Sequence, residues 1–130
     1  MQLVAKYFIP ASLVIVGAIH LLPLQGILGG DRLTALYGIA IEEENLLILM
    51  RHRALLFGLL GGFLVWAAFR PSLYGPALLA GAISVAGFLL IALQSVERNS
   101  EIARVVSIDV FALILLAIAA LLKLAAPGAR

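Results

Sequence analysis

The stretch LLILMRHRALLFGLLGGFLVWAAF, residues 46–69, decides the fold class of this chain. A helix needs about 20 mostly apolar residues to cross the hydrocarbon core of a bilayer, and this stretch supplies that length with its charges confined to the first third. Three more segments have the same character, at residues 3–24, 77–94 and 105–122. The sequence therefore predicts an all-α membrane protein, an antiparallel bundle of four transmembrane helices in a single domain over residues 1–130.

The composition excludes most soluble classes of protein. Hydrophobic residues make up 64% of the chain and charged residues 12%, and the mean hydropathy is +1.16. A soluble domain of this length needs more polar groups to cover its surface. The net charge of +2 comes without any basic run, so we expect no nucleic-acid partner. The absence of cysteine excludes disulfides and thiolate sites.

The longest connection, residues 25–45, is predicted to contain a short interfacial helix. Gly29-Gly30-Asp31 is typical of a turn followed by a helix start, with Asp31 as the N-cap. Residues on one apolar face of this helix would be Leu33, Leu36, Tyr37 and Ile41. The acidic run of residues 42–44 then precedes the second span, where acids suit the positive end of a helix.

Four spans place both termini on the same side of the membrane. The basic residues on that side are Lys6, Arg70, Lys123 and Arg130. The opposite side carries Arg32, Arg98 and Arg104, once Arg51 and Arg53 are set aside because they lie inside a span. All seven acidic residues fall on that opposite side. The slight excess of bases predicts cytoplasmic termini, in a bacterial inner membrane.

Polar residues gather near one end of the predicted bundle. His20 lies near the end of the first span, Gln94 ends the third and Asp109 lies near the start of the fourth. Because successive helices alternate in direction, these positions share one membrane face with the start of the second span. The candidate ligand-binding residues are His20, Glu44, Asn45, Arg51, His52, Gln94 and Asp109.

Helical geometry limits which of the two arginines in the second span can face the bundle. Arg51 and Arg53 lie about 160° apart around a helix. Arg51 shares its face with Gly58 and Gly62, a spacing that permits close helix approach. We therefore expect Arg51 to point inward and Arg53 to extend toward the interface. We expect this face to pack against a matching small face of the third span, which comprises Ala80, Ser84, Gly87, Ile91 and Gln94.

Three kinds of chemistry fit this polar layer. His20, His52 and Asp109 could hold a divalent metal ion, although they lack the spacing of a known motif. The two histidines could instead ligate a haem between two spans. Without a metal, the arginine, histidine and acid groups could bind a quinone, lipid or organic acid whose apolar part enters the bundle. Asp109 paired with an arginine could also serve only to hold two helices together.

Several motifs of the chain resemble those of a known group of membrane proteins. They are Gly17-Ala18-Ile19-His20-Leu21-Leu22-Pro23, Tyr37-Gly38-Ile39, Glu44-Asn45 and Leu49-Met50-Arg51-His52-Arg53-Ala54. The pattern is similar to small bacterial four-helix membrane proteins, many of which carry the name phosphopantetheine adenylyltransferase, and broadly to DoxX-like membrane proteins. That transferase is a soluble α/β enzyme with an HxGH-type motif. Here His20 is followed by Leu-Leu-Pro and His52 by Arg-Ala-Leu, so the name does not suit this chain.

The sequence thus predicts a membrane protein that binds or transforms a small amphipathic ligand near one membrane face. The alternative is a structural or accessory subunit whose ionic layer only fixes the packing of the helices. A haem- or metal-binding redox protein is the third interpretation. Membrane lipids are the expected surroundings, and assembly into a homo-oligomer or a larger membrane complex is compatible with all three.

Overall fold

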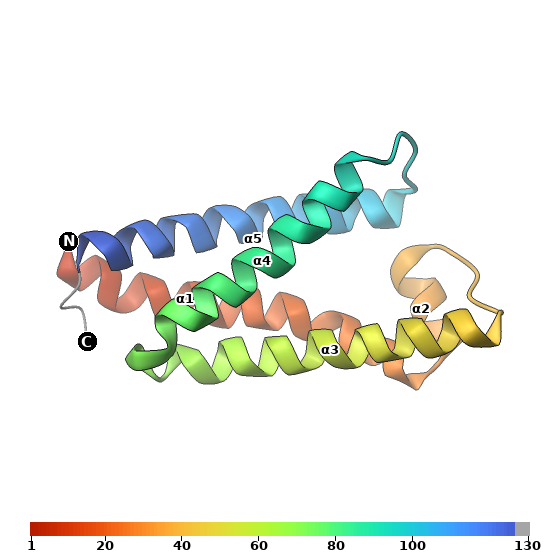
Figure 1. The fold of residues 1–130 in the computed structure, drawn as a ribbon, viewed down its shortest axis with the longest axis horizontal. Coiled ribbons are helices and arrows are strands. Elements are labelled where there is room, and N and C mark those ends of the chain that lie inside the picture. Colours follow the sequence, from red (N-terminus) through yellow and green to blue (C-terminus); the bar gives the residue numbers. More distant parts are fainter. Residues whose placement is uncertain (127–130) are drawn as a thin grey trace.

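The computed structural model describes residues 1–126, which are helical and contain no strand (Figure 1). Arg130, which entered the count of basic residues above, lies outside the described residues. Four helices are long enough and apolar enough to cross a membrane, as predicted. They are α1 (Gln2–Leu21), α3 (Glu44–Ala68), α4 (Tyr74–Leu93) and α5 (Ser100–Ala125).

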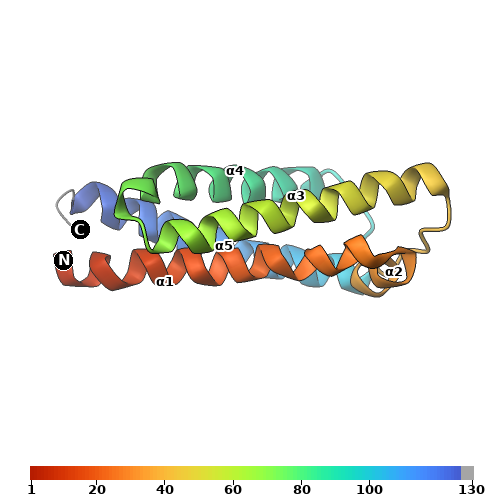
Figure 2. The ribbon, with the colours of Figure 1, turned by 90° about the horizontal axis from the view of Figure 1, so that it is seen from below.

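Short elements complete the chain. The first connection contains η1 (Leu22–Leu28) and α2 (Gly30–Tyr37), and η2 (Pro71–Leu73) leads into α4. Figure 1 shows the N-terminus and the end of α5 at one end of the molecule and α2 at the other. In Figure 2 the four long helices lie lengthwise beside one another.

Side-chain caps place two helix starts earlier than the apolar pattern predicts. The carboxylate of Glu43 accepts hydrogen bonds from the backbone amides of Asn45 and Leu46, so α3 begins in the acidic run. Asn99 caps α5 in the same way, through a 2.8 Å bond from the amide of Ile102 to its Oδ1 atom. These bonds satisfy amides that have no partner within the helix.

The region of α2 confirms part of its predicted apolar face and corrects its predicted bounds, because α2 ends at Tyr37 and Ile41 lies beyond it. Leu33, Tyr37 and Ile41 are buried together, with Leu36 packed against them. The expectation that Asp31 is the N-cap is wrong, because the helix begins at Gly30 and Asp31 lies in its first turn. Gly29 precedes the helix with a φ of 140°, a conformation open to glycine and rare for other residues.

Helices α1 and α3 form the most extensive contact between the long helices, and α4 packs mainly on α5. The α1–α3 contact passes through Gly17 and Gly61, where the two backbones approach closely. The expected packing of Gly58 and Gly62 against α4 is wrong. A Cβ at Gly58 would meet Leu24 of η1, and one at Gly62 would meet nothing within 4 Å.

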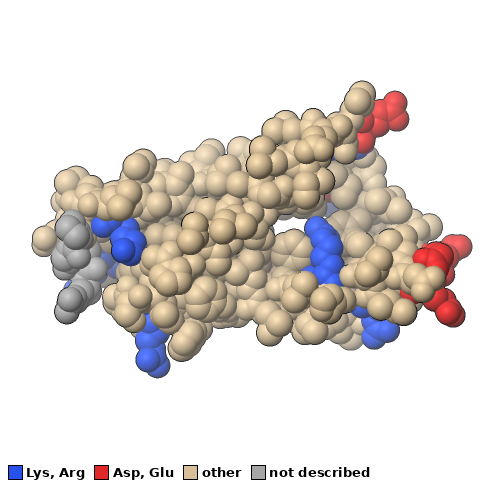
Figure 3. All heavy atoms as spheres, in the orientation of Figure 1, with Lys and Arg blue, Asp and Glu red and all other residues tan. Residues whose placement is uncertain are grey.

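The main apolar core lies between the four long helices. Its fully buried large side chains include Ile9, Leu13, Leu64 and Leu116. Charged side chains lie mostly toward the ends of the molecule (Figure 3). In that view the acidic side chains gather toward the α2 end, while a basic side chain borders a hollow in the surface between α4 and α3. Toward the α2 end the core leaves a cavity.

Candidate ligand pocket

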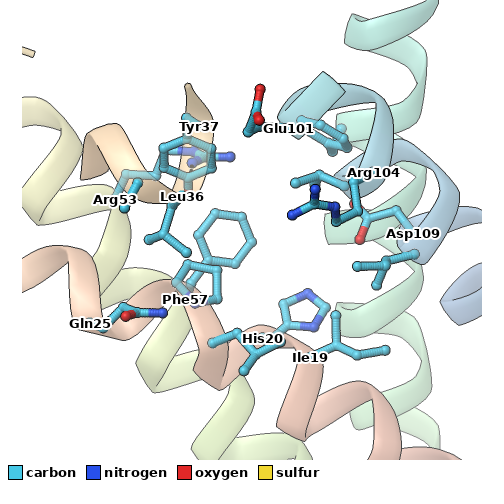
Figure 4. A pocket seen from close by; sticks show the side chains of 16 residues that line it. Ile19, His20, Gln25, Leu36, Tyr37, Arg53, Phe57, Glu101, Arg104 and Asp109 are labelled. Carbon is cyan, nitrogen blue, oxygen red and sulfur yellow. Dashed lines mark hydrogen bonds between the residues drawn. The ribbon is translucent and has the colours of Figure 1, made fainter. Parts of the chain in front are cut away.

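A pocket of about 270 Å³ lies where η1 and α2 meet the long helices α1, α3, α4 and α5. Its walls are largely apolar and include Phe57, Phe88 and Ile108. Polar side chains face it from four helices and from η1 (Figure 4). They are His20, Gln25, Tyr37, Arg53, Glu101, Arg104 and Asp109.

Arg53 is held in the pocket wall by two aromatic residues. Its Nη1 atom donates a 2.8 Å hydrogen bond to the hydroxyl of Tyr37 on α2. The guanidinium carbon lies 4.6 Å from the centre of the Phe57 ring and 5.3 Å from the centre of the Tyr37 ring. Aromatic faces attract a cation at such distances. The side chain therefore has a defined position between α2 and α3.

His20 is buried, with only 3% of its surface exposed. Its Nδ1 atom bonds the carbonyl oxygen of Val16 at 2.9 Å, and its Nε2 atom lies 3.1 Å from the hydroxyl oxygen of Ser84. The ring also packs on Phe57, with 5.6 Å between the ring centres. Because both nitrogens have partners within the protein, His20 serves as a wall of the pocket and as a link between α1 and α4.

Helix α5 supplies the charged side of the pocket. Figure 4 shows Glu101, Arg104 and Asp109 on this side, across from Tyr37, Arg53 and Phe57. The carboxylate of Glu101 accepts a 2.8 Å hydrogen bond from the hydroxyl of Ser100. Asp109 is half-buried, and the charge of Arg53 acts on it across the pocket. The two guanidinium and two carboxylate groups give the pocket a balanced formal charge.

Asn99 ties α2 to the start of α5 beside the pocket. Its Nδ2 atom donates a 2.7 Å hydrogen bond to the carbonyl oxygen of Tyr37, while its Oδ1 atom caps α5. Gly38, which follows α2, has a φ of 65° and lies close to Asn99 and Glu101. A side chain at Gly38 would be strained and would collide with Glu101. One residue thus fixes both the end of α2 and the beginning of α5.

Two of the seven candidate residues meet in this pocket, His20 and Asp109. The others are exposed and do not line it: Glu44, Asn45, Arg51, His52 and Gln94. Each of these five stands near the α2 end, as its position along its helix predicts. Arg51 and His52 lie at the depth of Arg53, so the rotation of α3, which depth does not determine, keeps them out of the pocket. Glu44 and Asn45 lie in the first turn of α3, about 12 Å along the helix from Arg53, and Gln94 follows the last residue of α4.

The inward orientation expected for Arg51 is wrong. Its side chain is exposed, and its Nε atom donates a 2.8 Å hydrogen bond to the carbonyl oxygen of Ile27 in η1. Arg53, which we expected at the interface, takes the inward position instead. In these positions each cation lies against groups that stabilise it, aromatic rings beside Arg53 and a carbonyl oxygen beside Arg51.

The two histidines do not converge on a common site. His20, on α1, is buried with both ring nitrogens bonded. His52, on α3, is exposed. Within residues 1–126, no three histidine, cysteine or acidic side chains come together as a metal-binding group. The structure therefore does not bring His20, His52 and Asp109 together, and of the two histidines only His20 lines the pocket.

The sequence reasoning missed Tyr37, Arg53, Phe57, Glu101 and Arg104 as pocket residues. A signal was available for two of them. Arg53 and Phe57 lie four residues apart, so a cation and an aromatic ring share one face of the helix. Glu101 and Arg104 precede residue 105, where the apolar pattern predicts the start of the fourth span, so the sequence places them in a loop.

No protein-family model, no curated protein and no solved structure matches this chain. The pocket and its side chains are therefore the basis on which a function can be proposed.

Proposed function

We propose that this chain is an integral membrane protein that binds a small amphipathic ligand, a quinone, lipid or organic acid, in the pocket beside α2. The pocket itself supports this most strongly, because it joins a mostly apolar wall to guanidinium and carboxylate groups. Ligand sites in proteins usually combine apolar walls with a few fixed polar groups. Charged groups within or beside a membrane span are costly, which favours a functional role for them.

In this proposal the four long helices cross a bacterial inner membrane in antiparallel order, with cytoplasmic termini. Lys6, Arg70 and Lys123 would then lie on the cytoplasmic side, in accord with the positive-inside tendency. Helix α2 would lie at the outer interface, with the pocket at the depth of the lipid head groups. A reporter fused to the C-terminus tests the orientation. Activity confined to a cytoplasmic reporter supports it, and activity confined to a periplasmic reporter overturns it.

Tryptophan quenching by bromooctanoate tests the ligand site. The chain has one tryptophan, Trp66, which is exposed and not part of the pocket. The double variant Trp66→Phe/Phe88→Trp moves the fluorophore into the pocket wall. In lipid nanodiscs we expect saturable quenching in this variant, reversed by octanoate without bromine. The unsubstituted protein is the control. Quenching of its Trp66 should rise with the amount of bromooctanoate in the lipid and should not saturate. Unsaturable quenching at both positions would contradict the proposal.

A second candidate is a structural or accessory subunit. The His20–Ser84 hydrogen bond favours it, since this bond joins α1 to α4 and leaves the histidine no free nitrogen for a ligand. A homo-oligomer or a larger membrane complex would then be the functional unit. Purification under mild conditions distinguishes the two. Stable association with other chains, together with no saturable quenching, supports the structural role.

A further inference from the structure

Most polar groups of the pocket already have partners within the protein. Tyr37 and Arg53 bond each other, and both nitrogens of His20 are occupied. Within the described part of the chain, Arg104 and Asp109 have neither a hydrogen bond nor an ion pair through their side chains, although the charge of Arg53 acts on Asp109 and the charge of Arg104 acts on Glu101. These two are therefore the charged side chains of the pocket that a ligand can engage, and Gln25, which also lines the pocket, is a neutral one.

Arg104 and Asp109 lie on the same helix, α5, at different positions along its axis. Five residues of an α-helix correspond to a rise of about 7 Å and a rotation of about 140°. Val105 and Ile108, which also line the pocket, lie between them in sequence. Both side chains nevertheless line the pocket, so a polar head group in it meets a cation at one point and a carboxylate at another, with apolar contact beside both.

The size of the pocket limits the rest of the ligand. Its volume of about 270 Å³ is near the lower end of the range of about 300–1,000 Å³ for ligand pockets. A single short chain or one ring fits such a space, and a diacyl lipid does not. The formal charges of Arg53, Arg104, Glu101 and Asp109 cancel. A ligand without net charge preserves that balance, and burial of an unpaired charge is costly.

We infer that the pocket takes a small zwitterionic amphipath, with a carboxylate bound by Arg104, an ammonium group bound by Asp109 and one apolar chain against Phe57 and Phe88. An apolar α-amino acid is the simplest member of this class. This inference rests on the proposed function and narrows it. It assigns opposite roles to two residues on α5.

Four probes with the same chain length test the inference: α-aminooctanoate, octanoate, octylamine and octanol. The affinity of each probe is measured by its ability to displace bromooctanoate from the Trp66→Phe/Phe88→Trp protein in nanodiscs. We expect α-aminooctanoate to bind at least about tenfold more tightly than each of the others, the effect of one additional charge-assisted hydrogen bond. When Asp109→Asn is added to the double variant, α-aminooctanoate should bind no more tightly than octanoate. When Arg104→Gln is added instead, α-aminooctanoate should bind no more tightly than octylamine.

The outcomes separate this inference from the proposed function. Equal affinity for octanoate and α-aminooctanoate overturns the zwitterion and leaves the amphipath site standing. Failure of all four probes to displace bromooctanoate overturns both. If Asp109→Asn or Arg104→Gln does not fold, the order of the four binding affinities in the protein that keeps Arg104 and Asp109 still tests the inference. Arg104→Lys and Asp109→Glu, which retain the charges, should preserve that order.

Discussion

Gly17 of α1 and Gly61 of α3 lie against each other's backbones. A Cβ on Gly61 would come within 2.7 Å of the carbonyl oxygen of Gly17, and a Cβ on Gly17 within 2.9 Å of the carbonyl oxygen of Gly61. Such distances leave no room for a methyl group. Small residues permit this close approach of membrane helices, which pack through van der Waals contact.

We expect Gly61→Ala to destabilise the protein by about 1–3 kcal/mol, because the added methyl group forces α1 and α3 apart. Thermal unfolding of the purified protein in one fixed detergent measures the change. Gly62→Ala is the matched control, since a Cβ there meets nothing within 4 Å. Equal loss of stability in the two variants would show that the α1–α3 contact is not tight at Gly61.

The hydrogen bond between His20 and Ser84 joins two helices distant in sequence. Ser84→Ala removes it, and we expect a loss of about 0.6 kcal/mol and at most about 1.7 kcal/mol, the range for side-chain bonds between membrane helices. Ser107→Ala is the control, because that hydroxyl bonds the carbonyl of Ala103 within its own helix. Unfolding in detergent compares the two. A larger loss in Ser107→Ala would contradict the assigned role of Ser84.

The fold could be predicted because span length and composition are local properties. Four long apolar segments suffice to indicate four long helices. The helix starts were missed where a polar residue caps the helix. Glu43 and Asn99 lie outside the apolar runs, yet their side chains bond the first amides and extend α3 and α5 into polar sequence.

Only part of the candidate site could be predicted, because hydropathy does not fix the rotation of α3 about its axis. The helix is apolar around most of its circumference, so Gly58, Gly61 and Gly62 all offered a packing face. Close approach at Gly61 selects one rotation. That rotation brings Arg53 into the pocket and leaves Arg51 outside. The sequence thus predicts how far along each helix a polar residue lies. The side of the helix that faces the pocket depends on tertiary contacts, which the sequence pattern does not give.

A double-mutant cycle tests the bond between Tyr37 and Arg53. Tyr37→Phe removes the hydroxyl and keeps the ring, and Arg53→Met removes the charge with little loss of volume. We expect a coupling energy of about 0.5–1.5 kcal/mol in unfolding, the contribution of one hydrogen bond. The cycle of Tyr37→Phe with Arg51→Met should be additive, because Arg51 bonds Ile27 instead. Coupling in the second cycle but not the first would reverse the assignment of the two arginines.

The cap at Glu43 predicts a specific pH dependence. Hydrogen bonds from the backbone amides of Asn45 and Leu46 hold the pKa of the Glu43 carboxyl below its ordinary value of 4.5. The folded state thus favours the charged form, so the cap stabilises α3 above pH 4.5 and its contribution is lost as the pH falls through the lowered pKa.

In an NMR titration, the amide signals of Asn45 and Leu46 should therefore move together at a pH below 4.5. Glu43→Gln should abolish this joint movement. Glu42→Gln should leave it in place, because Glu43 is the capping residue. A joint movement that survives in Glu43→Gln would assign the cap to another carboxyl group.

Asn99 makes two bonds that can be separated by substitution. Its Oδ1 atom caps α5, and its Nδ2 atom donates to the carbonyl oxygen of Tyr37 at the end of α2. Asn99→Ala removes both bonds, and we expect a loss of about 1 kcal/mol from the cap alone, within the usual range of about 0.5–2 kcal/mol. Asn99→Asp keeps an oxygen for the cap and loses the donor. Its carboxylate also faces the Tyr37 carbonyl.

We therefore expect Asn99→Asp to retain the protection of the Ile102 amide from hydrogen exchange while α2 loses protection, because α2 is then no longer held to α5. Asn99→Ala should lower protection at both places. Hydrogen exchange read by mass spectrometry over α2 and over the first turn of α5 gives both values from one sample. If Asn99→Asp left α2 fully protected, the contacts of Leu33 and Ile41 would suffice to hold it, and the bond from Asn99 to Tyr37 would not be needed.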